Sequence, residues 1–149
     1  AKESVIYNIK NLNTSKEYDI TKALFCVISP ETDTQLTIKN HLNRNGYHNI
    51  IQIEDSSKAF DVIKKNNPDI IICELISTDL CRQINSDPET ESTPLLLLTR
   101  IKEKRLLRSL SENGISALLL KPVNETELIG LAKYHIKNNF LIRKLLNSN

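Results

Sequence analysis

Five short apolar runs alternate along the chain with longer segments in which polar residues interrupt the apolar ones. The runs cover residues 23–28, 50–53, 70–73, 95–98 and 117–120. They are too short for typical helices, and the second and third consist mainly of isoleucine, which favours strands. Runs with few polar interruptions are typical of strands buried on both faces, as in a parallel sheet.

The third run is the most informative stretch of the sequence. An Asn67-Pro68-Asp69 turn leads into three isoleucines and a cysteine, and Glu74 follows. In open α/β sheets, sites are built where the strands end on their carboxyl side. The sequence therefore predicts a buried central strand with a carboxylate at the edge where sites form.

The segments between the first three runs carry helix signals. Ser29 is predicted to cap a helix with Pro30 in its first turn. That helix should direct three side chains inward and end before Gly46, since glycine suits the left-handed position after a helix. The three side chains are Leu36, Ile38 and Leu42. After the second run, Asp55 is predicted to cap a helix containing Ala59, Phe60, Val62 and Ile63.

The second half of the chain continues the alternation. Residues 76–86 leave room for a short helix, and residues 102–113 form an amphipathic segment closed by Gly114. Asn124, with Glu127 three residues later, resembles a capping box at the start of a helix running to about Leu146. Strands alternating with helices predict one α/β domain with a parallel sheet, right-handed crossovers and helices on both faces.

Composition excludes several classes of protein. The 149 residues carry a net charge of only +2, so no strong field points to nucleic acid or an anionic membrane. No apolar run approaches the ~18 residues of a membrane span. Three cysteines without metal-ligand spacing suggest buried, reduced thiols and a cytoplasmic location. They are Cys26, Cys73 and Cys81.

Other candidate residues are interpreted as ordinary. The three histidines, His41, His48 and His135, share no close spacing. The basic residues between positions 100 and 108 fit a solvated helix face better than a nucleic-acid site, because no aromatic residues are interleaved with them. No glycine-rich loop follows the first strand, and no nucleophile–base pair is apparent, so an enzyme is not expected.

Over residues 22–136 the motifs resemble the receiver (CheY-like) domain of two-component response regulators. The most specific segments are 81–90, 93–99, 118–123 and 127–128, which look like receivers attached to diguanylate cyclases. The resemblance implies a flavodoxin-like five-stranded sheet of order 2-1-3-4-5. In that family, an aspartate ending the third strand accepts a phosphoryl group from a histidine kinase. An acidic pair after the first strand binds Mg²⁺.

Two positions match the family's site. Thr99 matches the hydroxyl residue that ends the fourth strand, and Lys121 matches the lysine that ends the fifth. Both contact phosphoryl oxygens in the family. The resemblance also implies a cis peptide bond between Lys121 and Pro122.

The remaining positions depart from the family. Glu74 stands at the phosphoacceptor position, and Ser29-Pro30 replaces the acidic pair, leaving Glu31 as the nearest carboxylate. Arg100 replaces the small residue after the switch threonine, and Leu118 occupies the position of the aromatic switch residue. The loop after the third strand is also shortened.

These departures predict a pseudo-receiver that is not phosphorylated, has no cofactor and does not bind Mg²⁺ tightly. Mg²⁺ prefers near-octahedral oxygen ligands, and the weak candidates here are only Glu31 and Glu74. The longer Glu74 side chain would misplace a nucleophile but reach Lys121 directly. Two alternatives stay open: a working phosphoacceptor that uses Glu31 or Glu74, and a small-anion sensor that uses Lys121 and Arg100.

The chain is predicted to divide into a leader (residues 1–21), a receiver-like domain (22–137) and an extension of the last helix (138–149). The extension carries five apolar side chains that need a cover: Phe140, Leu141, Ile142, Leu145 and Leu146. Candidate covers are leader residues 6–12, a second subunit or an absent output domain. The favoured one is a homodimer through the face of the fourth helix, fifth strand and fifth helix, which is the family's usual dimer surface. Other signalling proteins are the expected partners, with no role for nucleic acid or a membrane.

Overall fold

The computed structural model describes residues 19–74, 79–100, 108, 112 and 114–147. Five parallel strands form one sheet in the order β2-β1-β3-β4-β5, which confirms the predicted fold and strand order. The strands are β1 (Phe25–Ile28), β2 (Ile50–Ile53), β3 (Ile70–Glu74), β4 (Leu95–Thr99) and β5 (Ala117–Leu120).

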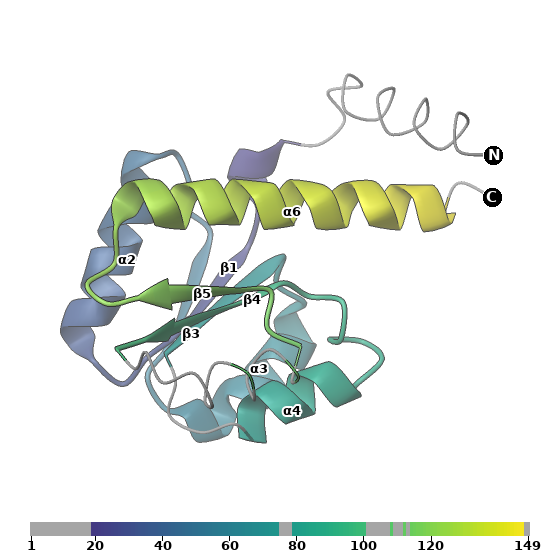
Figure 1. The fold of residues 1–149 in the computed structure, drawn as a ribbon, viewed down its shortest axis with the longest axis horizontal. Coiled ribbons are helices and arrows are strands. Elements are labelled where there is room, and N and C mark those ends of the chain that lie inside the picture. The colour runs from purple at the N-terminus through teal and green to yellow at the C-terminus, as the bar shows by residue number, and fades with distance from the viewer. Residues whose placement is uncertain (1–18, 75–78, 101–107, 109–111, 113, 148–149) are drawn as a thin grey trace.

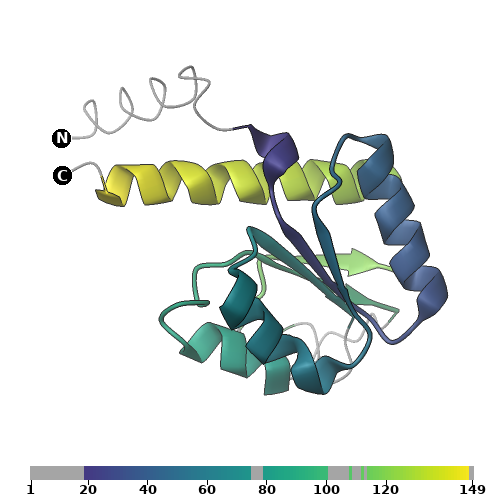
Figure 2. The same ribbon diagram turned by 180° about the vertical axis from the view of Figure 1, so that it is seen from behind.

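Helices connect the strands on both sides of the sheet (Figures 1 and 2). The α-helices are α2 (Thr32–Arg44), α3 (Ala59–Asn66), α4 (Asp79–Ser86) and α6 (Glu125–Asn147), and the 3₁₀ helices are η1 (Ile20–Lys22) and η2 (Ser56–Lys58). The amphipathic segment expected at residues 102–113 lies mostly outside the described residues.

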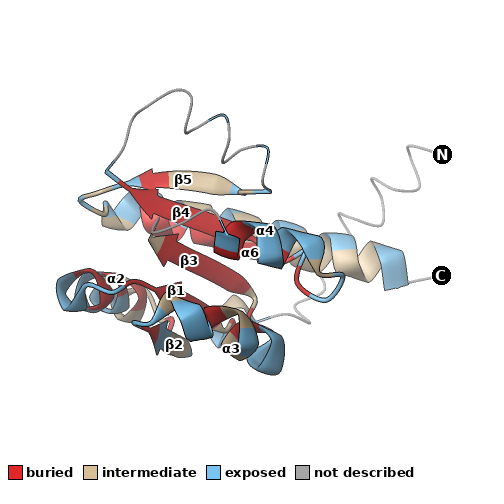
Figure 3. Cartoon of the chain, turned by 90° about the horizontal axis from the view of Figure 1, so that it is seen from below, coloured by how far each residue is buried: buried red, intermediate tan, exposed pale blue. Residues whose placement is uncertain are grey.

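Two apolar layers sandwich the sheet. On one face, α2 and α6 pack on alternate residues of the strands, with Ile38 and Leu128 among the buried contacts. On the other face, α3 and α4 contribute Ile63 and Ile84. Figure 3 shows β3 and β4 as buried for nearly their whole length. The central strands therefore have the two-sided burial that their uninterrupted apolar runs predict.

Several local predictions are confirmed. Gly46 follows α2 with a φ of 87°, in the left-handed region that glycine tolerates. The Asp55 carboxylate accepts a hydrogen bond from the Ser57 N–H at 3.0 Å and so caps η2, which leads directly into α3. The Asn124 side chain accepts from the Glu127 N–H at 2.9 Å. These contacts fix where the helices begin and end.

The predicted start of the first long helix is wrong by two residues. Glu31, not Ser29, is the N-cap of α2, and Pro30 precedes the helix. Ser29 has other partners, because its N–H donates to the Ile53 carbonyl at 3.0 Å and its hydroxyl donates to Glu74. Pairing with the sheet therefore keeps Ser29 out of the helix.

Leu36 was expected to face the core, and that prediction is wrong. Its side chain is 55% exposed, whereas Ile38 and Leu42 are fully buried. At about 3.6 residues per turn, a residue two positions before Ile38 lies on the opposite side of the helix. Gln35 and Thr34 take the inward positions in the first turns of α2.

The last helix extends beyond the strands of the sheet. Figures 1 and 2 show α6 starting beside the carboxyl end of β5 and projecting past the amino ends of the strands. The helix continues to Asn147, close to the predicted end. Within the described ranges, no helix combines the length and apolar character needed to cross a membrane.

Candidate functional site

The carboxyl ends of β1, β3, β4 and β5 bring four of the predicted site residues together. Ser29 follows β1, Glu74 ends β3, Thr99 ends β4 and Lys121 follows β5. Because all strands are parallel, these ends lie on the same edge of the sheet. This is the edge at which the sequence places the site.

The predicted pair between Glu74 and Lys121 is present. The Lys121 ammonium donates a hydrogen bond to Oε1 of Glu74, and the Ser29 hydroxyl donates to Oε2 of the same carboxylate. The Lys121 and Glu74 side chains are only 7% and 12% exposed. Both oxygens of the Glu74 carboxylate therefore accept hydrogen bonds from groups of the protein itself.

Lys121 has a second acidic partner that sequence reasoning did not pair with it. Its ammonium donates to the Glu31 carboxylate at 2.8 Å, and the Thr34 hydroxyl donates to the same oxygen at 3.0 Å. Hydrogen bonds from Lys121 and then Thr34 hold the pKa of Glu31 below its usual range. Burial lowers the pKa of Lys121, but its hydrogen bonds to Glu31 and Glu74 outweigh burial and raise it overall.

The backbone around Lys121 has the form that the resemblance implies. The Lys121–Pro122 peptide bond is cis. The Lys121 N–H donates to the Thr99 carbonyl at 3.0 Å, which ties the end of β5 to the end of β4. Thr99 itself is buried, with 4% of its surface exposed.

Gln35 binds the backbone that presents Ser29 to the site. The sequence analysis did not identify this role. Its side-chain amide donates to three backbone carbonyls, those of Val27, Ser29 and Ile53, at 3.0–3.2 Å. These carbonyls belong to the carboxyl ends of β1 and β2 and to the turn that presents Ser29. A glutamine in the first turns of an amphipathic helix gives no sequence signal for such a role, because its acceptors come from two separate strands.

Arg100 lies at the rim of the site and is exposed. It lines a surface hollow of about 400 Å³ together with Lys121, Pro122 and the start of α2. The same hollow contains the carboxylates of Glu31 and Asp33. Positive and negative groups thus face one another in the hollow, and Lys121 already has acidic partners.

The other predicted site positions lie nearby. Pro30 is exposed in the turn between Ser29 and Glu31, and it offers no side-chain oxygen to a metal ion. Leu118, predicted to occupy the switch position, is half-buried in β5 and packs against the apolar layer that contains Cys73. Among the described residues, no cluster of three His, Cys, Asp or Glu side chains is arranged to hold a metal ion.

The side chains of the cysteines and histidines do not take part in the hydrogen bonds among Ser29, Glu31, Glu74 and Lys121. All three cysteines are buried free thiols, as predicted. Burial raises the pKa of Cys26 and of Cys73 to about 12, so both stay protonated at neutral pH. His48 and His135 lie outside the site, and His41 belongs to a separate cluster at the end of α2.

Comparison with known families decides the classification. Residues 25–133 match the family model described as the response regulator receiver domain, which covers most of the chain. The chain belongs to the response regulator receiver family. Receivers are signal-transduction modules that interact with histidine kinases and other signalling proteins, and this agrees with the fold and with the position of the site.

Curated relatives include histidine kinases and a chemotaxis protein. The chain is 28% identical over 136 residues to Histidine kinase P4 of Formosa agariphila, covering 88% of the chain but 9% of that protein. It thus spans a small fraction of that kinase's length. It is 23% identical to chemotaxis protein CheY-3 of Vibrio cholerae, over 61% of the chain and 74% of that protein.

Solved receiver structures share the fold. The signal receiver domain of a putative Luxo repressor protein from Vibrio parahaemolyticus superposes with a TM-score of 0.74 at 20% identity, covering 85% of this receiver and 98% of the other chain. A putative response regulator from Chloroflexus aurantiacus gives a TM-score of 0.71 at 22% identity, with coverages of 77% and 98%. At such identities the likeness concerns the fold.

Proposed function

We propose that this receiver is not phosphorylated and that it acts through protein–protein contacts. The observation that carries the proposal is the bonding of Lys121, whose ammonium already contacts the carboxylates of Glu74 and Glu31. In a phosphoryl-accepting receiver, the equivalent lysine contacts the transferred group. In this chain, the carboxylates of Glu74 and Glu31 occupy the place beside the lysine that the transferred group would take.

The state of Glu74 supports the proposal. A carboxylate nucleophile needs a free oxygen aligned with the incoming phosphorus atom. In Glu74, one oxygen accepts from Lys121 and the other from Ser29. Each oxygen keeps a second lone pair, but the two hydrogen bonds fix the orientation of the carboxylate in a site where the side chain is 12% exposed, so it cannot turn freely toward an incoming phosphorus atom.

The donor set does not fit Mg²⁺. This ion prefers a near-octahedral shell of oxygens, typically with one or two carboxylates. Glu31 and Glu74 are the candidate metal ligands, and the Lys121 ammonium contacts both carboxylates as their counter-ion. A divalent ion would have to displace a buried cation, so we expect weak affinity and no metal-assisted transfer.

The test is incubation with acetyl phosphate and Mg²⁺, followed by intact-mass measurement. We expect no stoichiometric gain of a phosphoryl group in the native protein, nor in Glu74→Gln or the exposed control Glu54→Gln. A Mg²⁺-dependent gain that Glu74→Gln or Glu31→Gln abolishes would instead establish the alternative, a receiver with an atypical phosphoacceptor. A gain of mass that persists in both Glu74→Gln and Glu31→Gln would contradict both the proposal and this alternative.

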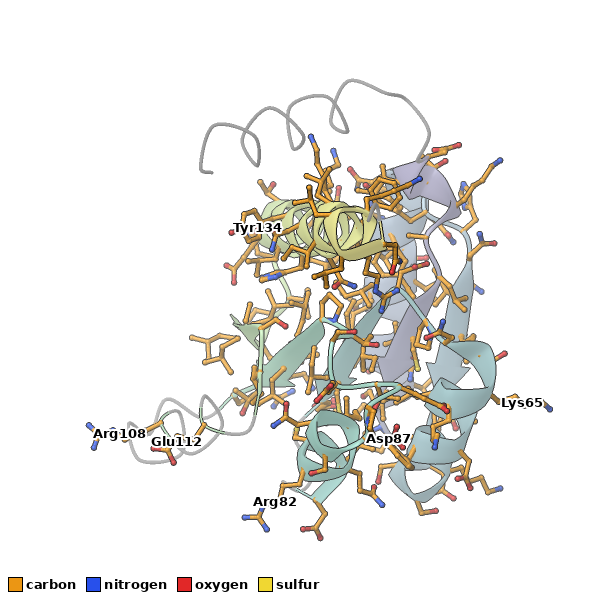
Figure 4. The ribbon with its side chains drawn as sticks, turned by 90° about the vertical axis from the view of Figure 1, so that its right-hand side faces the viewer. Lys65, Arg82, Asp87, Arg108, Glu112 and Tyr134 are labelled. Carbon is orange, nitrogen blue, oxygen red and sulfur yellow. The ribbon has the colours of Figure 1, made fainter. Side chains whose placement is uncertain are left out.

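The partner surface and domain limits form the second part of the proposal. We place the receiver at residues 22–137 and assign residues 138–149 to an extension that supports self-association, together with β5 and α6. On these elements Leu120, Tyr134, Ile142 and Leu146 are 37%, 63%, 47% and 73% exposed (Tyr134 is labelled in Figure 4). The similarity of residues 81–99 to receivers attached to diguanylate cyclases suggests that class as the output setting.

A further inference from the structure

A second polar cluster joins the end of α2 to the start of α6, outside the site described above. His41, Arg44 and Asn45 come from the last turn of α2 and its cap. Glu125 is the first residue of α6, and Val123 precedes it in the loop that follows Pro122. The cluster therefore fastens the loop that carries Lys121 onto α2.

Both ring nitrogens of His41 have partners. Nε2 lies 3.2 Å from the Val123 carbonyl, which can only accept, so Nε2 carries a hydrogen. Nδ1 lies 2.6 Å from Nη2 of Arg44 and 2.9 Å from Oε1 of Glu125. The same nitrogen thus has a donor and an acceptor within hydrogen-bond distance.

The two neighbours of Nδ1 suit opposite protonation states. In the neutral ring, Nδ1 has a lone pair and accepts from Arg44, which also donates to Glu125 through Nε at 2.8 Å and Nη2 at 2.5 Å. In the protonated ring, Nδ1 carries a hydrogen that points at Glu125. The imidazolium then repels the guanidinium 2.6 Å away.

We propose that His41 is a proton-operated switch in this cluster: protonation replaces Arg44 by a direct bond from His41 to Glu125. The ring keeps its bond to the Val123 carbonyl in both states. Arg44 is free to leave, because its side chain is 55% exposed, whereas that of His41 is 15% exposed. Histidine is the side chain whose charge ordinarily changes between pH 5 and 8.

The charged groups around His41 support this exchange. Among the described residues, those in contact with its ring are Arg44 from α2 and Glu125 from α6. Hydrogen bonds, first from Arg44 and then from His41, hold the pKa of Glu125 below its usual range. Glu125 is therefore ionised throughout the histidine range and can accept the new hydrogen bond.

The consequence is a pH-dependent attachment of the loop between β5 and α6. This loop holds the cis Lys121–Pro122 bond on one side and the Val123 carbonyl on the other. Protonation exchanges the Arg44–Glu125 ion pair for a His41–Glu125 ion pair between the same two helices, and the new pair comes from the ring that also binds the Val123 carbonyl. The inference does not depend on whether Glu74 accepts a phosphoryl group.

The test is an NMR titration of the three histidine rings in the full chain. In the native protein, we expect His41 to occupy the Nε2–H tautomer at high pH. Arg44→Gln and Glu125→Gln each remove one of the two charged neighbours of Nδ1, so they should move the pH-dependent change of the His41 ring signals in opposite directions. Arg82→Gln, on α4, is the matched control and should leave it unchanged.

His48 and His135 serve as internal references, because neither contacts the cluster in the described part of the chain. Opposite changes at His41 in the two variants, with steady reference histidines and the Nε2–H tautomer at high pH, are the result expected of the switch. Shifts of the same sign, no shift in either variant, or an Nδ1–H tautomer at high pH would overturn it. Each variant is first checked for a native circular dichroism spectrum.

Discussion

Replacement of Lys121 by methionine tests the central ion cluster most directly. Methionine keeps much of the aliphatic volume but removes the ammonium that neutralises Glu74 and Glu31. The loss leaves Glu74 as an uncompensated carboxylate that is 12% exposed. A charge stranded in this way is costly, because its partner was lost while its desolvation remains.

The magnitude lies between two limits. Exposed ion pairs contribute about 0–1 kcal/mol, whereas removing one partner of a buried pair costs about 3–5 kcal/mol. With Glu74 mostly buried and Glu31 half exposed at 50%, we expect the free energy of unfolding to fall by about 2–3 kcal/mol. At about 3 °C per kcal/mol for a chain of this size, Tm should fall by about 6–9 °C.

The direction of the Lys121 pKa shift determines the pH at which the stability should be measured. Its pKa is raised in the folded state, so its contribution to stability is complete below the unfolded value of about 10.4. The contribution is lost only as the pH rises through the folded value. Urea unfolding followed by circular dichroism at pH 7 therefore samples the whole effect.

A double-mutant cycle identifies the cause. Glu74→Gln removes the charge that Lys121→Met leaves stranded, so the double variant should be more stable than Lys121→Met by about 1 kcal/mol or more. Lys39→Met, at an exposed position on α2, should change stability by less than about 0.5 kcal/mol. A coupling energy near zero, or a Lys121→Met cost no larger than that of Lys39→Met, would refute the reasoning.

Two further predictions concern the backbone and the last helix. Gly114→Ala should destabilise the protein by more than about 1 kcal/mol in the same urea assay, because Gly114 has a φ of 82° and a Cβ there would lie 2.3 Å from Oδ1 of Asn85. Gly130→Ala in α6, where a Cβ meets nothing within 4 Å, should be neutral or stabilising by up to about 1 kcal/mol. If both glycine substitutions changed the free energy of unfolding equally, this explanation would be contradicted. Ending the chain at Lys137 should keep the core folded, since Ile136 is the last buried α6 residue of the apolar layer that this helix covers, but shift the protein toward monomer in sedimentation. A native chain that is already monomeric at high concentration would exclude the dimer.

The sequence by itself determined the sheet and most helix ends. Apolar runs such as residues 70–73 specify buried strands whatever surrounds them, because few other environments accept four apolar residues in a row. Caps such as Asn124 and the left-handed Gly46 depend on contacts within a few residues, so their signals are local. The resemblance supplied the strand order, the cis Lys121–Pro122 bond and the pairing of Lys121 with Glu74.

Local signals failed at two positions in and before α2. Ser29 was predicted to cap the helix, but its N–H pairs with the Ile53 carbonyl, and its hydroxyl donates to Glu74, 45 residues away, while it accepts from the Glu31 N–H. Leu36 was predicted to be a core residue, but it lies opposite Ile38 on α2, and Gln35, whose amide binds carbonyls of β1 and β2, takes an inward position. For Ser29 contacts across the sheet outweigh a local preference, whereas for Leu36 the helical period already directs the side chain away from the core.

Only the tertiary structure determined which charged side chains contact one another. Glu31 and Lys121 are 90 residues apart, and His41 and Glu125 are 84 apart. No spacing rule connects such positions, since their contact exists only after parallel strands bring their carboxyl ends to one edge and α2 packs beside α6. The sequence contains the charged residues, but only the fold brings Lys121 into contact with both Glu31 and Glu74. The fold likewise places His41 between Arg44 and Glu125.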